Sequence, residues 1–118
     1  MREDFLHYVW SYKLFSMLDL QTFNNSRLKI LKSGVHNLNS GPDFLNATIA
    51  IDDLLWVGNV EIHVKSSDWY LHNHEIDGNY DTVILHVVWE HATEALDCNS
   101  QPIPTLELKG LVAEELLQ

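Results

Sequence analysis

Residues 55–66 alternate between apolar and polar side chains, and no other feature of the sequence limits the fold as strongly. Successive side chains of a β-strand point to opposite faces of its sheet, so this alternation predicts a strand with one buried face. The even-numbered positions supply that face, beginning with Trp56. The opposite face then presents three ionisable side chains in a row: Glu61, His63 and Lys65.

Apolar patterns predict four more strands, over residues 27–32, 43–51, 80–91 and 105–109. The run 80–91 is apolar along nearly its whole length, which is typical of a strand covered on both faces. Asp52 and Asp53 favour a turn, so the strands on either side of them are expected to form an antiparallel hairpin.

Helical periodicity is clearest at the start of the chain. Apolar residues recur every three or four positions over residues 5–18, and Glu3 and Asp4 suit the first turn of a helix. Residues 66–79 fit one or two helical turns or a long loop, and residues 111–118 begin like an amphipathic helix. We therefore expect an α+β fold, with the N-terminal helix packed on a mixed sheet of about four to five strands. A mainly antiparallel β fold is the alternative.

Composition narrows the functional classes. Acidic residues outnumber basic ones by 17 to 7, which gives a formal charge of −10 and no broad basic face for nucleic acid. Cys98 is the only cysteine, so internal disulfides and zinc sites of several cysteines are excluded. The chain has no apolar run that could span a bilayer and no signal-peptide pattern, so we expect a cytoplasmic protein. Residues 1–118 are expected to form one domain, the N-terminal part of a longer chain.

Two carboxylates are predicted to meet on the sheet. Asp43 follows Gly41 and Pro42 at the start of its strand, and in an antiparallel hairpin it faces the row that contains Glu61. Paired carboxylates favour a hard cation such as magnesium, which prefers oxygen ligands. A nearby lysine such as Lys65 can position water or stabilise developing charge. These parts suit the hydrolysis of phosphodiester bonds.

The segments Gly41–Asp43 and Val60–Lys65 resemble the PD-(D/E)XK restriction-endonuclease-like superfamily. The resemblance implies a helix, three strands, a crossover helix and a fourth strand, with a magnesium- or manganese-dependent nuclease site that is active or vestigial. It assigns Asp43 and Glu61 as metal ligands and either His63 or Lys65 to the role of the superfamily's lysine. Glu61 and Lys65 stand four positions apart instead of two, which is a departure from the motif.

A second resemblance covers the whole chain. The runs NSGPDF, WVGNVEIHVKSSDW and YDTVILHVVWEH are similar to the start of an uncharacterised bacterial protein family of longer chains. This resemblance implies no established activity.

Three alternatives stand beside the nuclease hypothesis. Asp43 is also suited to bonding backbone amides in a turn, and the row from Glu61 to Lys65 also fits a solvated strand face. His72 and His74, with or without His86, have a spacing at which imidazoles bind zinc or another transition metal in a β-rich domain. A non-catalytic interaction module is the third alternative.

The four tryptophans are interpreted as packing residues rather than as a stacking platform for sugars or bases. Trp10 and Trp56 fall on faces that are expected to be buried. Trp69 lies in the segment between two strands and is the one expected to be exposed.

Overall fold

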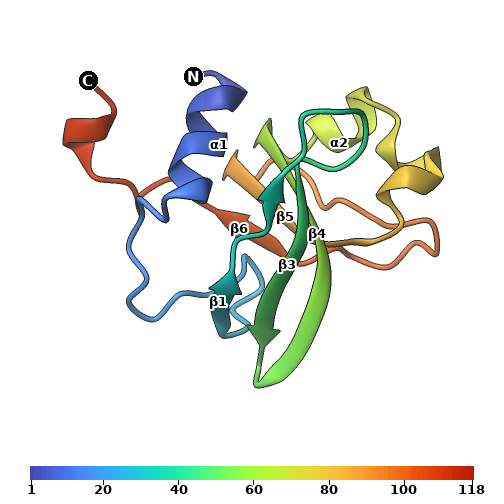
Figure 1. Cartoon of the computed structure of the whole chain (residues 1–118), viewed down its shortest axis with the longest axis horizontal. Coiled ribbons are helices and arrows are strands. Elements are labelled where there is room, and N and C mark those ends of the chain that lie inside the picture. Colours follow the sequence, from blue (N-terminus) through green and yellow to red (C-terminus); the bar gives the residue numbers. More distant parts are fainter.

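The chain forms a curled mixed sheet with a short helix packed against it, and the computed structural model describes residues 1–118 (Figure 1). The strands are β1 (Leu28–Lys32), β2 (Val35–His36), β3 (Phe44–Ile51), β4 (Leu54–Lys65), β5 (Val83–Glu90) and β6 (Thr105–Glu107). The α-helices are α1 (Glu3–Ser11) and α2 (Asp68–Leu71), and three short 3₁₀ helices are η1 (His74–Ile76), η2 (Gly78–Tyr80) and η3 (Glu114–Leu116).

The sheet has the strand order β1-β3-β4-β5-β6, and β2 pairs with β3 beside β1. Strands β1, β3 and β4 are antiparallel neighbours, whereas β5 is parallel to β4 and β6 is parallel to β5. The α+β prediction is confirmed, and the mainly antiparallel alternative is wrong. The segment between β4 and β5 is long enough to carry the chain back and make the parallel pairing.

The hairpin of β3 and β4 turns at the predicted place. Asp52 and Asp53 have φ angles of 48° and 69°, and Ile51 pairs with Leu54 across the turn. A two-residue hairpin turn with both φ angles positive twists in the same sense as its strands, and Asp tolerates this conformation. The turn therefore fixes the register as far as Ala47. An irregularity between Phe44 and Ala47, where Asn46 has a φ of 58°, shifts the register by one residue and places Asp43 beside Glu61.

Helix α1 ends earlier than the sequence predicts. Leu6, Val9 and Trp10 are buried against the sheet, but the helix stops at Ser11 and Lys13 has a left-handed φ of 53°. The apolar pattern continues past this point because the following loop is also buried: Phe15 stacks on Trp10 with ring centroids 6.0 Å apart. At the other end of the chain, the expected amphipathic helix is reduced to η3.

The exposure of two tryptophans is the reverse of the prediction. Trp69 of α2 is 1% exposed, and its indole N–H donates a 3.0 Å hydrogen bond to the Leu96 carbonyl. It belongs to a small second core with Val83, Ala95 and Ile103. Trp56 is 45% exposed, because it lies on the part of β4 that extends past β5.

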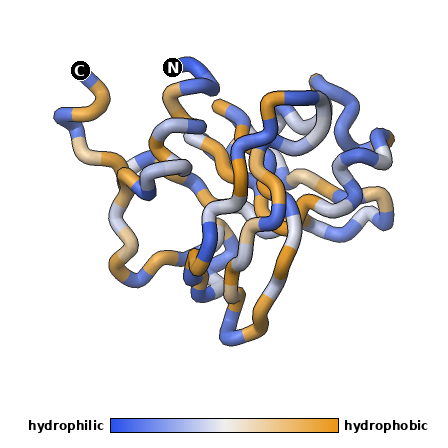
Figure 2. Tube along the Cα trace, viewed as in Figure 1, coloured by the Kyte–Doolittle hydropathy of each residue, from blue (hydrophilic) through white to orange (hydrophobic).

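Hydrophobic residues are most frequent along the central strands, whereas the connections on the side of α2 are mostly hydrophilic (Figure 2). The protein contains no helix with the length and apolar character needed to cross a membrane.

Candidate metal centre

Two acidic side chains meet where β3 begins and β4 approaches its end. The Asp43 N–H donates to Oε1 of Glu61 at 3.2 Å, and the Ile62 N–H donates to Oδ2 of Asp43 at 2.8 Å. These bonds follow from the hairpin register, in which Phe44 pairs with Val60. The structure therefore brings together the two carboxylates that the sequence pairs.

Two histidines contact the same glutamate, and a third contacts one of them. Nε2 of His74 lies 2.7 Å from Oε2 of Glu61, and Nε2 of His63 lies 3.4 Å from that oxygen. Nε2 of His63 is also 3.1 Å from Nδ1 of His72. The ligand atoms of the three imidazoles all lie within 4.8 Å of one another. The two separate sites expected from the sequence thus form a single cluster.

The parallel crossover explains this convergence. His63 follows Glu61 by two positions on β4 and shares its face, while His72 follows α2 and His74 begins η1. Asn73 between them has a left-handed φ of 57°, which turns the chain sharply. Tyr80 then stacks on His74 at 3.6 Å between ring centroids and holds its imidazole against the cluster.

The cluster has the donor types and spacing of a transition-metal site. Zinc binds imidazole nitrogen and carboxylate oxygen at about 2.0–2.2 Å, so neighbouring tetrahedral ligands are about 3.4 Å apart. The His63 nitrogen has neighbours at 3.4 Å and 3.1 Å. Although Nε2 of His74 is 2.7 Å from Oε2 of Glu61, it has no hydrogen-bond partner. Its lone pair is therefore available to an ion.

A protein-family model matches residues 3–118, almost the whole chain, and describes a family of proteins of unknown function, DUF2851. The chain belongs to the DUF2851 family. Its predicted resemblance to an uncharacterised family agrees with this match, whereas no comparison indicates a PD-(D/E)XK protein. Neither a curated protein nor a solved structure matches the chain.

Burial gives the two carboxyl groups of this DUF2851 chain opposite pKa shifts. Desolvation, followed by the hydrogen bond and repulsion from Asp43, raises the pKa of Glu61 to about 10. Burial alone raises the pKa of Asp43 too, but the nearby His7 and Glu61 and the hydrogen bond from the Ile62 N–H outweigh it and lower that pKa. Without a cation, Glu61 therefore holds a proton and Asp43 is ionised.

The same burial keeps the histidines neutral. Desolvation lowers the pKa of His63 to about 2 and that of His86 to about 3, and it also lowers the pKa of His74. Neutral imidazole is the form that binds metal ions, so His63 and His74 are already in their binding form at neutral pH.

His86 lies behind His63 and determines which of its nitrogens can bind an ion. Nε2 of His86 is 2.7 Å from Nδ1 of His63, and Nδ1 of His86 has no hydrogen-bond partner. If Nδ1 of His63 carries the proton and donates to His86, then Nε2 of His63 has its lone pair free toward the cluster. In that tautomer His86 is a buried acceptor that orients a ligand, rather than a ligand itself.

We expect His86→Phe to weaken zinc binding by about 10- to 100-fold, the usual cost of losing such an orienting partner. Competition with a chromophoric chelator measures this affinity. The thermal unfolding of the metal-free variant is the control for its folding, and an unchanged zinc affinity in a folded variant contradicts the role of His86.

The remaining predicted residues lie at the edges of the centre. The interpretation of the β4 row as a solvated face is wrong for Glu61 and His63, which are 4% and 1% exposed, but it holds for Lys65. Lys65 forms no ion pair and its backbone N–H bonds to Asp68. Glu3 is half-buried on α1, where burial and Asp43 raise its pKa.

No motif in the sequence singles out His7, yet its Nε2 lies 3.5 Å from Oδ1 of Asp43. The interaction with Asp43 raises the pKa of His7 more than burial lowers it. The available signal is its spacing from Glu3, four positions along one helix, which places both side chains on the same face.

Proposed function

We propose that this domain is a metal-dependent hydrolase whose ion is held by Glu61, His63, His72 and His74, with phosphodiesters as its substrate class. The observation that carries the proposal is a group of three imidazoles within 4.8 Å of one another, two of which lie within 3.4 Å of a buried carboxylate. Asp43 beside this cluster supplies the second carboxylate expected from the sequence.

The donor set favours zinc over magnesium. Magnesium prefers oxygen ligands and retains several waters, whereas imidazole nitrogen suits zinc and other transition metals. The sequence favours magnesium or manganese held by Asp43 and Glu61 alone. With histidines added, we propose Zn²⁺ as the resident ion and Mn²⁺ as a substitute.

Asp43 and His7 are suited to handling a proton beside the ion. A bound zinc ion lowers the pKa of water and stabilises developing negative charge. Asp43 orients His7 and favours its protonated form, which fits a donor of a proton to a leaving oxygen. Asp43 itself is fixed by the Ile62 N–H.

A restriction-endonuclease-like core is part of the proposal. Its support is the order of elements: α1, the antiparallel strands β1, β3 and β4, a short helical crossover, and β5 parallel to β4. His63 stands beside Glu61 where the superfamily motif has a lysine, and Lys65 is exposed. The net charge of −10 disfavours long polyanions, so a small phosphodiester is the appropriate first substrate.

The test is hydrolysis of bis(p-nitrophenyl) phosphate by the zinc-loaded chain. We expect Asp43→Asn to lower the rate by about 100-fold or more through loss of proton transfer, while zinc remains bound. Lys65→Ala is the matched control and should retain activity. Equal hydrolysis by wild type and Asp43→Asn would end the proposal of catalysis.

A structural ion is the second candidate function. Four protein ligands are typical of structural zinc sites, whereas catalytic sites usually have three and an open position. Glu61 and the three histidines number four, although His72 is exposed and gives the cluster access to solvent. Tight zinc binding without any hydrolysis by the wild type would favour this second function.

A further inference from the structure

Strand β4 extends past its neighbour β5 and leaves part of one edge unpaired. Residues 54–58 pair with β3 on one side, but the pairing with β5 begins only at Asn59, opposite Val83. The free part lies in the hairpin that projects from the sheet next to its turn (Figure 1). It is at the opposite end of β4 from the metal centre: Val57 and His63 are about 20 Å apart at the usual rise of a strand.

The backbone of this edge has hydrogen-bonding groups to offer. The Asn59 N–H points toward β5 and donates to the Thr82 carbonyl at 3.0 Å. Backbone groups alternate sides along a strand, so Leu55 and Val57 direct their N–H and C=O groups toward the same side, beyond the end of β5. A sheet edge of this kind is a template for another strand.

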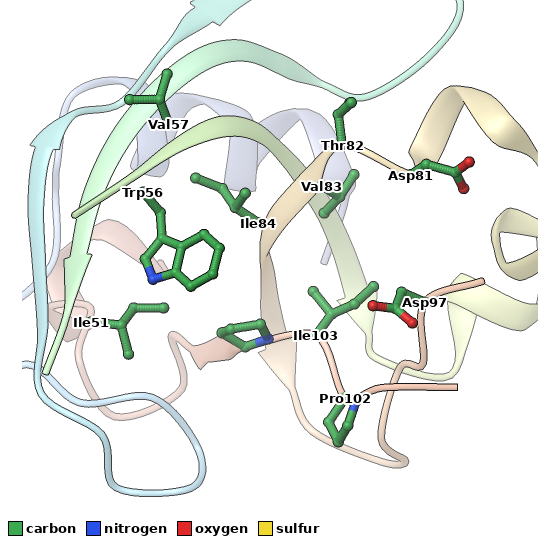
Figure 3. Close-up of a pocket in the computed structure, with 11 residues that line it drawn as sticks. Ile51, Trp56, Val57, Asp81, Thr82, Val83, Ile84, Asp97, Pro102 and Ile103 are labelled. Carbon is green, nitrogen blue, oxygen red and sulfur yellow. The ribbon is translucent and has the colours of Figure 1, made fainter. Parts of the chain in front are cut away.

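An apolar pocket of about 500 Å³ adjoins the free edge (Figure 3). Trp56, Ile51 and Ile84 lie toward one end, and the carboxyl groups of Asp81 and Asp97 lie at the other. Leu55 and Val57 are 59% and 64% exposed beside it. Proteins usually protect such edges with lysine, proline or a bulge, and residues 54–58 contain none of these.

We propose that residues 54–58 bind an extended segment of a partner protein as an added β-strand. Its apolar side chains lie in the pocket of Trp56, and a basic side chain lies beside Asp81 and Asp97. Backbone hydrogen bonds to Leu55 and Val57 supply affinity, and the pocket and its carboxylates supply specificity. This inference is independent of the metal centre and its chemistry.

Charge decides between a basic partner and a second copy of the chain. The chain carries a net charge of −10, and four aspartates surround the edge: Asp52, Asp53, Asp81 and Asp97. Arg27 neutralises part of the charge at the turn. Two copies joined at this edge would oppose like charges, whereas a basic segment complements them.

The probe is a blocked octapeptide of alternating valine and threonine that ends in two arginines. Amide chemical shifts of the ¹⁵N-labelled chain report its binding. We expect shifts confined to residues 55–59 and 81–84, and at least tenfold weaker binding when glutamates replace the arginines. A peptide N-methylated at alternate residues should also bind at least tenfold more weakly, because it has lost the donors that pair with the edge.

Two variants test the edge itself. Val57→Pro removes a backbone N–H that does not bond to β3, so binding of the peptide should weaken at least tenfold. The hairpin should still fold, because proline is tolerated on edge strands. Val57→Thr keeps that N–H and should bind within threefold of wild type. The inference is overturned by absent binding at millimolar peptide, by equal binding of the N-methylated peptide, or by sedimentation that shows a dimer formed through this edge.

Discussion

Zinc in excess is expected to raise the Tm of the chain by about 10 °C or more. An ion at 100 times its Kd stabilises the folded state by about 2.7 kcal/mol, and each kcal/mol moves the Tm of a domain of this size by several degrees. The proposed ion would join two separate parts of the fold. Glu61 and His63 lie on β4, whereas His72 and His74 lie on the crossover, whose only regular elements are α2, η1 and η2.

The matched pair for this prediction is His63→Ala and His36→Ala. The first removes a ligand and should abolish the zinc-dependent increase in Tm, while the second changes an exposed histidine outside the cluster and should preserve it. Comparing each variant with and without zinc separates ion binding from any loss of packing. Magnesium should give no comparable increase. An equal zinc effect in both variants would show that the ion binds elsewhere.

Glu61→Gln is expected to have opposite effects on the metal-free protein and on zinc binding. The pKa of Glu61 is raised to about 10 in the folded state from an ordinary value of 4.5. Between these two pH values the folded state binds one more proton than the unfolded state, so stability falls as pH rises, by about 1.4 kcal/mol per pH unit. Glutamine resembles the protonated acid and does not titrate, so the fall in stability with rising pH should vanish in the variant. The variant also lacks one proposed zinc ligand, so its zinc binding should weaken.

The histidines produce the opposite slope on the acid side. The pKa values of His63 and His86 are lowered to about 2 and about 3 from 6.5, so the unfolded state binds more protons below pH 6.5. As the pH falls below 6.5, the protonation of these two histidines in the unfolded state lowers the free energy of unfolding by more than the protonation of Glu61 in the folded state raises it. The metal-free wild type should therefore be most stable near pH 6.5 and lose stability in both directions.

Urea unfolding in the presence of a chelator, from pH 5 to pH 9, measures these slopes. Glu61→Gln should remove the alkaline decline and keep the acid decline, which also serves as the internal control. Zinc binding to the wild type at pH 8 should release about one proton, supplied by Glu61, and the variant should release none. An alkaline decline of the same slope in both proteins would show that Glu61 is ionised without the ion.

Local patterns identified most strands because alternation reflects which face of a sheet is buried. They failed where exposure depends on distant neighbours. Trp56 stands at one of the positions of β4 that the alternation predicts to be buried, but β5 does not extend far enough to cover it. Trp69 is buried by residues that are far from it in the sequence. Helix α1 shows a third kind of failure, since a buried loop can continue an apolar pattern after helical backbone bonding has ended.

The sequence located the hairpin that carries Asp43 and Glu61, because the turn at Asp52 and Asp53 sets a local register. The irregularity between Phe44 and Ala47, which shifts that register by one residue and aligns Asp43 with Glu61, was not predicted from it. Only the tertiary structure decided that His72 and His74 share that site. Their position depends on β5 pairing parallel to β4, a contact between distant segments that side-chain alternation cannot encode. Burial then fixed the protonation states, since removal from water keeps His63 neutral and Glu61 protonated.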